Sequence, residues 1–349
     1  MKINKVAHIT TGEGGEFQSA KIINDFFASK GILSSLIPIK KKDIFFMRLF
    51  DEGLISFNFL KSLRKEVKNK EVIFFHCLFS YSYLVILLFI RIFCKKRLIV
   101  FFRNDDSFGS FFRKIYYGLR RFILLNFSLI FASKIIFLTR NQKESYLKSS
   151  MFDINFYKKS EVMYNFLDKR NILSKARKFK LPNNLLFIGR LTKEKGFSDL
   201  IRLASDIKSK FGVVGQGEYI LKGNINYFGQ LKNVKMNRVY DSYNILILPS
   251  YAETFGRVII EAMARGLVVL ASNLPAIREY FVDGRNGYLF PPGDIEKMKE
   301  LILYLKNNPK EMERISKNNL KDIWKFTAEK QVPKYIKVYE EVLKENRKK

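Results

Sequence analysis

Histidine and cysteine are the scarcest metal-binding residues in this chain. Its 349 residues include two histidines, His8 and His76, and two cysteines, Cys77 and Cys94. No cluster of these residues has the spacing of a metal site, so we expect no metal ion. Both cysteines lie in apolar surroundings, which indicates reduced, buried thiols in a cytoplasmic protein.

Acidic residues are few in relation to basic ones. The chain has 63 Lys and Arg against 33 Asp and Glu, a formal net charge of +30. Such an excess favours an anionic partner, either nucleic acid or the anionic inner face of a membrane, although part of the charge could serve solubility alone. The common nucleic-acid-binding motifs are absent, so we expect no nucleic-acid partner.

Long apolar runs are also scarce. The longest, Leu78–Cys94, is about 17 residues, at the lower limit for crossing a bilayer, and contains Arg91. It falls between two predicted strands, which favours a buried crossover helix. The N-terminus is not expected to be a signal peptide, because its short apolar run is interrupted by His8 and then by glycines.

Short apolar runs alternate with helical patterns in both halves of the chain. This alternation predicts an α/β fold with parallel sheets covered by helices. Helices are expected at Ser19–Lys30 and Phe111–Asn126. The predicted strands are Lys5–Thr10, Val72–His76, Leu98–Arg103, Lys134–Thr139, Leu185–Gly189, Gly212–Gly215, Ile245–Pro249 and Val268–Ser272. A polar, basic stretch at 165–184 separates the two sets and marks a domain boundary.

Two glutamates, Glu253 and Glu261, stand eight positions apart around the predicted start of a helix at Thr254-Phe255-Gly256. Along one helix axis this spacing is about 12 Å, too far for the carboxylates to share a proton or a metal ion. The pair suits the two ends of an elongated ligand whose anionic centre faces the helix N-terminus. A sugar joined through a diphosphate to a nucleoside has this shape.

The residues around this pair extend the pattern over about forty positions, with PS before it, EAMARG starting at Glu261, and VVLASN and IREYFVDGRNGYLFPPGD after it. Together they resemble the donor-binding signature of retaining glycosyltransferases of family 4, also described as glycosyl transferases group 1. The resemblance implies the GT-B fold, in which two Rossmann-like domains face each other across a cleft. It implies an acceptor-binding domain at 1–166, a nucleotide-sugar-binding domain at 167–322, and a C-terminal helix at 323–349 that packs back on the first domain.

The resemblance also assigns roles to donor-site residues. The run Gly189-Arg190 followed by Lys195-Gly196 is similar to an element of the family whose cations hold the donor diphosphate, which implies this role for Arg190 and Lys195. Glu253 would grip sugar hydroxyls and Glu261 the ribose hydroxyls. The remaining predicted donor-binding residues are Gly15, Gly229, Phe255 and Gly256.

On the acceptor side, the resemblance points to His76 and Arg103. His76 ends a predicted strand and aligns with a histidine near the acceptor cleft of the family, although a lone histidine is often structural. Many relatives have a histidine where Arg103 stands, so the acceptor-side chemistry is expected to differ. Asp105-Asp106 is not the D-x-D motif of metal-dependent transferases. We therefore expect no required cofactor or metal.

These features predict a cytoplasmic, membrane-associated enzyme that transfers a sugar, with retention, from a UDP- or GDP-sugar to a glycan or lipid-linked acceptor in surface polysaccharide or lipopolysaccharide synthesis. A nucleotide-sugar hydrolase or epimerase, or a non-catalytic basic protein binding membrane or nucleic acid, are the alternatives. The expected membrane anchor is the basic stretch Arg91–Arg121, in which aromatic and aliphatic residues interleave with Arg113, Lys114, Arg120 and Arg121.

Overall fold

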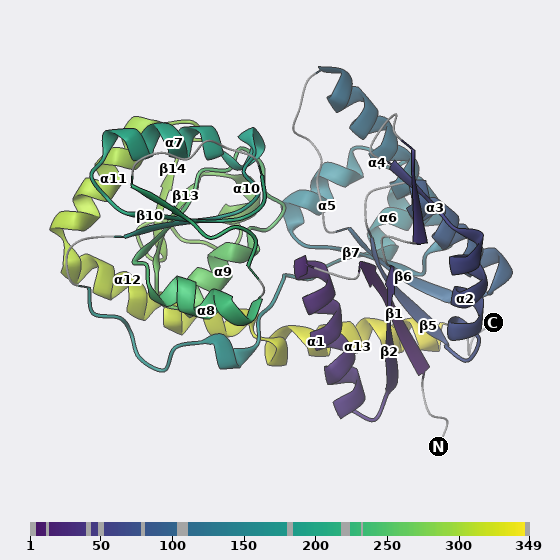
Figure 1. Ribbon diagram of the computed structural model, residues 1–349. Coiled ribbons are helices and arrows are strands. Elements are labelled where there is room, and N and C mark those ends of the chain that lie inside the picture. The colour runs from purple at the N-terminus through teal and green to yellow at the C-terminus, as the bar shows by residue number, and fades with distance from the viewer. Residues whose placement is uncertain are drawn as a thin grey trace. The chain divides into compact units, whose positions relative to one another are not determined.

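Two separate parallel sheets organise the chain, each within its own compact unit. The first unit comprises Met1–Ser107, Phe111–Asn165 and Ala328–Lys349, and the main part of the second is Phe166–Thr327. The structure is a computed structural model, shown in Figure 1. It describes residues 5–11, 14–39, 43–47, 52–77, 81–102, 111–179, 184–217, 224–231 and 233–345.

The first unit contains a six-stranded sheet in the order β2-β1-β5-β6-β7-β8, in which every neighbouring pair is parallel. A separate antiparallel hairpin, β3 (Ile44–Met47) and β4 (Glu52–Ile55), interrupts the chain after β2. The strands of the sheet are β1 (Lys5–Thr11), β2 (Leu33–Ile39), β5 (Val72–Cys77), β6 (Arg97–Phe102), β7 (Lys134–Phe137) and β8 (Ser160–Val162).

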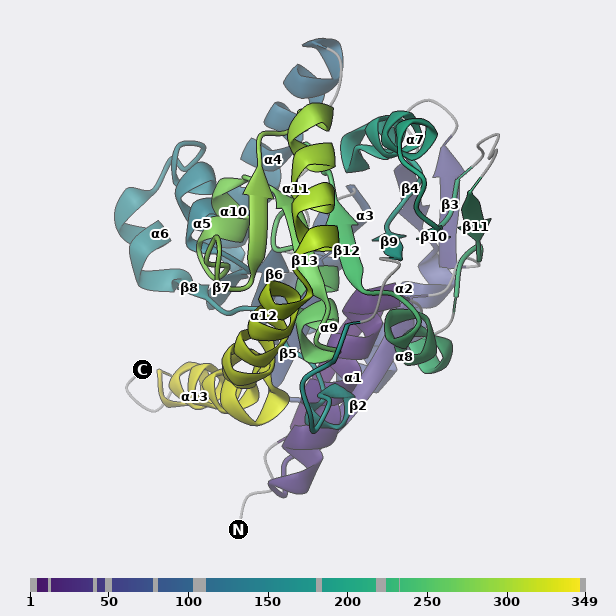
Figure 2. The same cartoon turned by 90° about the vertical axis from the view of Figure 1, so that its left-hand side faces the viewer.

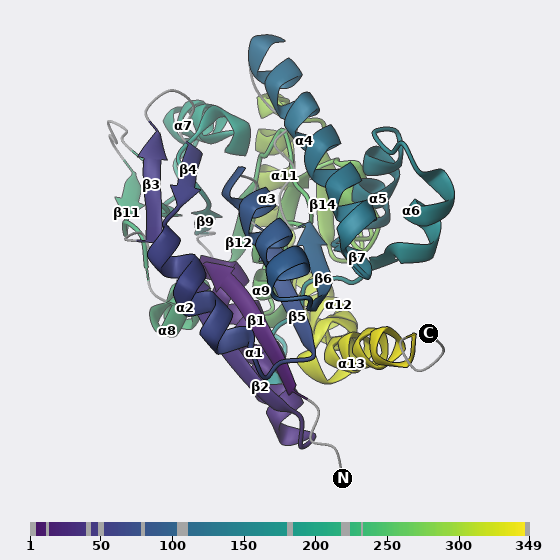
Figure 3. The same ribbon diagram turned by 90° about the vertical axis from the view of Figure 1, so that its right-hand side faces the viewer.

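Helices cover this sheet on both faces, and Figure 3 shows α2, α3 and α4 in front of it. The predicted crossover helix after β5 is present as α3 (Tyr81–Leu88), which continues into a π-helical turn, η2 (Phe89–Phe93). No helix among the described residues is long and apolar enough to cross a membrane. The other helices are α1 (Gly14–Ser29), α2 (Phe57–Val67), α4 (Phe111–Phe131), α5 (Arg140–Leu147) and α6 (Asp153–Lys159).

The helix α13 (Ala328–Lys344), at the end of the chain, belongs to the first unit. Its Tyr339 ring packs edge-on against Phe27 at 5.5 Å, and its Tyr335 ring stacks on Phe101 of β6 at 5.7 Å. Ile323–Phe326, which the sequence assigned to this helix, is instead a 3₁₀ turn of the second unit. It stays there because Phe326 packs edge-on against buried aromatic rings of that unit.

Helix α4 turns two of its arginines inward. Arg120 is only 5% exposed, and its guanidinium lies 4.6 Å from the centre of the Tyr117 ring. Arg121 donates to the Ser145 hydroxyl at 3.1 Å and lies over the Tyr146 ring. The prediction that Arg120 faces lipid headgroups is therefore wrong, because aromatic faces and burial hold it in the fold. The side chains of Arg113 and Lys114 lie outside the described part of α4.

The second unit has strand order β11-β10-β9-β12-β13-β14, again wholly parallel. The chain builds one side of the sheet from β9 to β11 and then crosses to β12, so the direction of winding reverses between β9 and β12. Such a reversal opens a crevice at the carboxyl ends of the two strands, where α/β sheets bind ligands. The strands are β9 (Leu185–Ile188), β10 (Phe211–Val214), β11 (Ile225–Tyr227), β12 (Ile245–Leu248), β13 (Val268–Ser272) and β14 (Gly287–Phe290).

Every residue of β12 and β13 is buried, as continuous apolar runs in a parallel sheet require. Figures 1 and 2 show α7 and α11 on one face of this sheet and α8, α9 and α12 on the other. The helices are α7 (Phe197–Asp206), α8 (Asn233–Asp241), α9 (Arg257–Ala264), α10 (Pro275–Arg278), α11 (Ile295–Asn307) and α12 (Pro309–Asp322). All eight predicted strands are present, with ends shifted by a residue or two.

The basic stretch that marks the domain boundary is tied into the second unit by Arg177. Its guanidinium donates to the carbonyl oxygens of Tyr243 and Arg265, both at 2.6 Å, and of Tyr240 at 3.0 Å. These carbonyls end α8 and α9, where a cation is favourable. The stretch around Arg177 is thus a fixed part of the second unit.

We expect Arg177→Met to lower the free energy of unfolding of the second unit by about 3 kcal/mol, because several carbonyls at two helix ends lose a charged donor. Urea unfolding followed by circular dichroism measures this change. The control is Lys178→Met, which removes an exposed cation from the next position and should change stability by less than about 0.5 kcal/mol. Equal stability of the two variants would refute the role of Arg177.

Candidate functional site

The candidate site lies at the carboxyl ends of β9 and β12, where the winding of the second sheet reverses. The chain leaves β9 through Gly189 and Arg190 into a 3₁₀ turn, Lys193–Lys195, and leaves β12 through Pro249. The two loops touch at Gly196, whose φ is 67°. A Cβ at Gly196 would lie 1.9 Å from the carbonyl oxygen of Pro249, so only glycine permits this approach.

This approach places Lys195 against Glu253. The Lys195 Nζ donates to Glu253 Oε1 at 2.8 Å, and the Ser250 hydroxyl donates to the same oxygen at 2.9 Å. The side chains of Lys195 and Glu253 are 17% and 11% exposed, so the charges are partly withdrawn from water. The predicted cation motif and the predicted glutamate pair thus each contribute one residue to an oriented ion pair.

Arg190 is held much more loosely. Its guanidinium is 3.3 Å from Glu194 Oε2, and its side chain is 63% exposed. A single exposed ion pair of this kind contributes little to stability. The guanidinium is therefore able to turn from Glu194 toward an anion above the strand ends.

Helix α9 begins directly beside these loops. Gly256, which has no side chain to cap the helix, precedes it in the left-handed conformation, with φ 73°, and the first turn contains no acidic residue. The preceding Phe255 is buried and stacks on Tyr280 at 4.6 Å, while the Tyr280 hydroxyl donates to the Phe255 carbonyl. Burial raises the pKa of Tyr280 well above its usual range, so this hydroxyl remains a donor. The helix thus begins, with its positive end, at a turn that these contacts hold in place.

The start of α9 corrects the geometry expected of the two glutamates. Glu253 lies in the loop before the helix, and only Glu261 lies within it, one turn from its first residue Arg257. The left-handed Gly256 breaks the axis between them. The prediction that the two glutamates lie about 12 Å apart along one helix axis is therefore wrong, because they do not share a helix.

Glu261 is held at both of its oxygens. Oε1 accepts from Arg257 Nε and Oε2 from the Tyr240 hydroxyl, each at 2.8 Å. Tyr240 is buried, and burial, with the Glu261 charge adding to it, raises the pKa of its phenol well above the usual value. Neither partner is among the site residues predicted from the sequence. Arg257 stands four positions before Glu261, a spacing that signals a helical ion pair, whereas nothing in the sequence brings Tyr240 of α8 to Glu261.

The glycine-rich turns after β10 and β11 adjoin the same edge. A Cβ at Gly215 would lie 1.7 Å from the carbonyl oxygen of Gly189, and the Gly215 N–H donates to the carbonyl of Gly229 at 2.9 Å. The Tyr227 hydroxyl also donates to the Gly215 carbonyl, at 3.0 Å. Gly229, one of the predicted donor-binding residues, is thus linked through Gly215 to the loop that carries Arg190.

The remaining predicted site residues, His76, Gly15 and Arg103, belong to the N-terminal part of the chain and not to the strand ends described above. His76 is 1% exposed, its Nε2 is 3.3 Å from His8 Nδ1, and its ring stacks on Phe101. Gly15 lies in the first turn of α1. Arg103 lies outside the described residues. The catalytic role of His76 and Arg103 and the ligand contact of Gly15 stay predictions.

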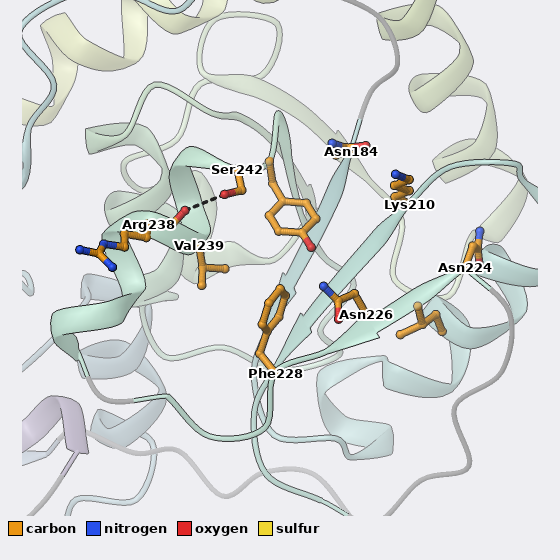
Figure 4. Close-up of a pocket in the computed structure, with 10 residues that line it drawn as sticks. Asn184, Lys210, Asn224, Asn226, Phe228, Arg238, Val239 and Ser242 are labelled. Atoms are coloured by element: carbon orange, nitrogen blue, oxygen red, sulfur yellow. Dashed lines mark hydrogen bonds between the residues drawn. The ribbon is translucent and has the colours of Figure 1, made fainter.

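A pocket of about 700 Å³ lies elsewhere in the second unit, between α8 and the face of β10 and β11 (Figure 4). It is lined at one end by Asn184, Lys210 and Asn224, which stand at the amino ends of the strands, opposite the candidate site. Phe228, next to Gly229, lines its other end. This pocket holds none of the predicted cations or glutamates. Among the described residues, no group of three or more His, Cys, Asp or Glu is placed to bind a metal ion.

Comparison with known structures identifies the fold. A crystal structure of HepE from Anabaena with UDP and glucose aligns with a TM-score of 0.75 over 97% of this chain and 100% of the other, at 15% identity. The lipopolysaccharide outer core galactosyltransferase WaaB aligns with a TM-score of 0.64 over 95% and 98% of the two chains, at 16% identity. At such identities the likeness shows the fold alone. The predicted pair of Rossmann-like domains of the GT-B class is confirmed.

Sequence comparison finds similarity to glycosyltransferases. Residues 168–322 match the family model described as glycosyl transferases group 1. An uncharacterized glycosyltransferase of Methanocaldococcus jannaschii is 30% identical over 207 residues, which cover 56% of this chain and 58% of the relative. The capsular polysaccharide biosynthesis glycosyltransferase CapM of Staphylococcus aureus is 26% identical, covering 52% of each chain. The chain thus spans about half the length of these curated relatives.

The two cations of the site should differ in their effect on stability. We expect Lys195→Met to lower the free energy of unfolding by about 1–3 kcal/mol, because it leaves the partly buried Glu253 without its charged donor. Arg190→Met, which removes an exposed ion pair, should change it by less than about 0.5 kcal/mol. Denaturant unfolding without ligand distinguishes them, and equal losses would show that the Lys195–Glu253 pair is not a fixed element of the site.

Proposed function

We propose that this protein is a glycosyltransferase of group 1 that uses a nucleotide-diphosphate-sugar donor and acts with retention of configuration, as in family 4. The observation that carries the proposal is the assembly of Arg190, Lys195, Glu253 and Glu261 at the reversal point of the second sheet, within the segment that matches the family model. Two oriented carboxylates, one before and one within the first turns of a helix, together with two cations, suit a ligand with a sugar, a diphosphate and a ribose.

In the proposed reaction, the bond between the anomeric carbon and the diphosphate oxygen breaks, and the diphosphate keeps the electron pair. Arg190, Lys195 and the N-terminus of α9 stabilise that developing charge. Glu253 holds the sugar hydroxyls through Oε2, because Lys195 and Ser250 both donate to Oε1. The acceptor hydroxyl attacks the same face of the sugar, and its proton passes to the leaving phosphate. We infer no metal, since cations of the chain supply the positive charge.

The first experiment offers the protein a panel of UDP- and GDP-sugars and measures thermal stabilisation. We expect one donor to raise the melting temperature, and turnover with a glycan or lipid-linked acceptor to persist in EDTA. Loss of activity in EDTA that Mg²⁺ restores would overturn the metal-independent mechanism. Sugar release without acceptor would favour a hydrolase, and no stabilisation by any donor would favour a non-catalytic basic protein.

Substitutions of Glu253 and Glu261 should affect different kinetic constants. Glu261→Ala is expected to raise the donor KM about tenfold with a smaller effect on kcat, because it binds ribose alike in the ground and transition states. Glu253→Ala should lower kcat by at least about tenfold, since it contacts the reacting sugar. Steady-state kinetics at saturating acceptor measure both. If the two variants lose the same property to the same degree, the assigned roles are wrong.

We further propose that the protein associates peripherally with the inner face of the cell membrane, where a lipid-linked acceptor of surface polysaccharide or lipopolysaccharide synthesis would lie. Support comes from exposed apolar side chains on neighbouring elements of the first unit. Phe93 of η2 is 64% exposed, and Leu119 and Ile130 of α4 are 56% and 54% exposed. Exposed cations, Arg91 and Lys95, flank Phe93. Apolar groups bordered by cations are typical of surfaces that lie in the headgroup region.

The membrane test uses apolar residues, because Arg120 and Arg121 are engaged within the fold. We expect the wild-type protein to sediment with anionic liposomes at low salt and less so at high salt. Leu119→Asn combined with Ile130→Asn should reduce the bound fraction several-fold. The matched control is Leu303→Asn, which changes an exposed leucine, 51% accessible, on α11 of the second unit. Equal sedimentation of the double variant and the control would count against this face as the anchor.

A further inference from the structure

We propose that Tyr240 and Arg257 are positioning residues that orient Glu261 to accept one hydroxyl of a ribose on each of its oxygens. The site would thereby select ribonucleoside diphosphates over their deoxy forms. This inference rests on the proposed donor site and adds two residues to it that contact Glu261 from different helices.

The geometry at Glu261 fixes the plane of its carboxylate. Arg257 Nε donates to Oε1 and the Tyr240 hydroxyl donates to Oε2, each at 2.8 Å. An ionised carboxylate has about four acceptor positions, two on each oxygen, so each oxygen retains one for a ligand. The Glu261 side chain is 30% exposed, which leaves its open side accessible. Two parallel acceptor positions match the neighbouring 2′ and 3′ hydroxyls of a ribose.

A second set of contacts fixes the distance between the two helices that form this arrangement. Arg177 donates to the carbonyl of Tyr240 on α8 and to that of Arg265, which caps α9. Arg265 in turn is paired with Asp241, the last residue of α8. The ends of α8 and α9 are thus bonded together independently of Glu261. The Tyr240 hydroxyl therefore meets Glu261 at a position set by the fold.

Both donors are chemically suited to this role. The Tyr240 phenol is buried beside a carboxylate, so it stays protonated and donates. Arg257 has only donor groups, and its planar guanidinium holds an acceptor in a defined direction. Neither donor can exchange roles with Glu261, which as a carboxylate only accepts. The ligand groups that remain for Glu261 must therefore be donors, as ribose hydroxyls are.

The test measures the affinity of UDP, 2′-deoxy-UDP and 3′-deoxy-UDP by isothermal titration calorimetry, together with the GDP series, for the wild type, Tyr240→Phe and Arg257→Gln. We expect the wild type to bind its ribonucleotide at least about tenfold more tightly than the deoxy forms. Each variant should weaken ribonucleotide binding about tenfold and weaken each deoxynucleotide, which keeps only one of the two hydroxyls, by clearly less, so the preference narrows. A residue with a purely structural role would weaken all the ligands alike.

The matched control is Tyr288→Phe, which removes another tyrosine donor to a glutamate, Glu311, at 2.7 Å in the same unit. It should leave affinity and preference unchanged. If Tyr240→Phe and Arg257→Gln keep the wild-type preference, or if all ligands weaken equally, the positioning role is refuted while the donor site stands. If the wild type binds none of the nucleotides, the proposed function itself fails.

Discussion

The contact between Gly196 and the carbonyl of Pro249 is the constraint on which the candidate site depends. The loops after β9 and β12 start on neighbouring strands, but side chains would normally hold them apart. A residue without Cβ in the left-handed conformation lets the two backbones meet. Lys195, immediately before this glycine, then reaches Glu253, four residues after Pro249. The strand order supplies the crevice, and the glycine brings opposite charges together within it.

The electrostatics of the site combine fixed and mobile groups. Lys195 and Glu253 are oriented by short contacts and partial burial, and Glu261 by two donors, so these groups need little reorganisation when a ligand arrives. Arg190 keeps most of its side chain in solvent. An exposed cation beside a preorganised pair suits the proposed donor, whose negative charge would grow during the proposed reaction, because the guanidinium is able to follow that charge.

The sequence predicted those features that depend on local pattern. The strands at Ile245–Leu248 and Val268–Ser272 were evident because burial on both faces requires continuous apolar runs. β11 was missed because it is a three-residue edge strand in which only Ile225 is aliphatic and the other two residues are exposed. Motif spacing located Glu253 and Glu261 but not the break that Gly256 makes between them. Tyr240 had no signal at all, since its contact with Glu261 exists only when α8 packs beside α9.

The large positive charge of the chain is only partly available to a partner. Arg177 and Arg265 are directed at carbonyls and at Asp241, and Arg120 lies against tyrosine rings. These cations support the fold by satisfying helix ends and aromatic faces, and their side chains have little exposure. Net charge therefore overstates the attraction to an anionic surface. Exposed apolar side chains such as Phe93, which is 64% exposed although its ring lies 5.6 Å from that of Phe89, need a separate explanation, because contact with water is unfavourable for them. The proposed association with a membrane surface rests on this combination of exposed cations and exposed apolar side chains.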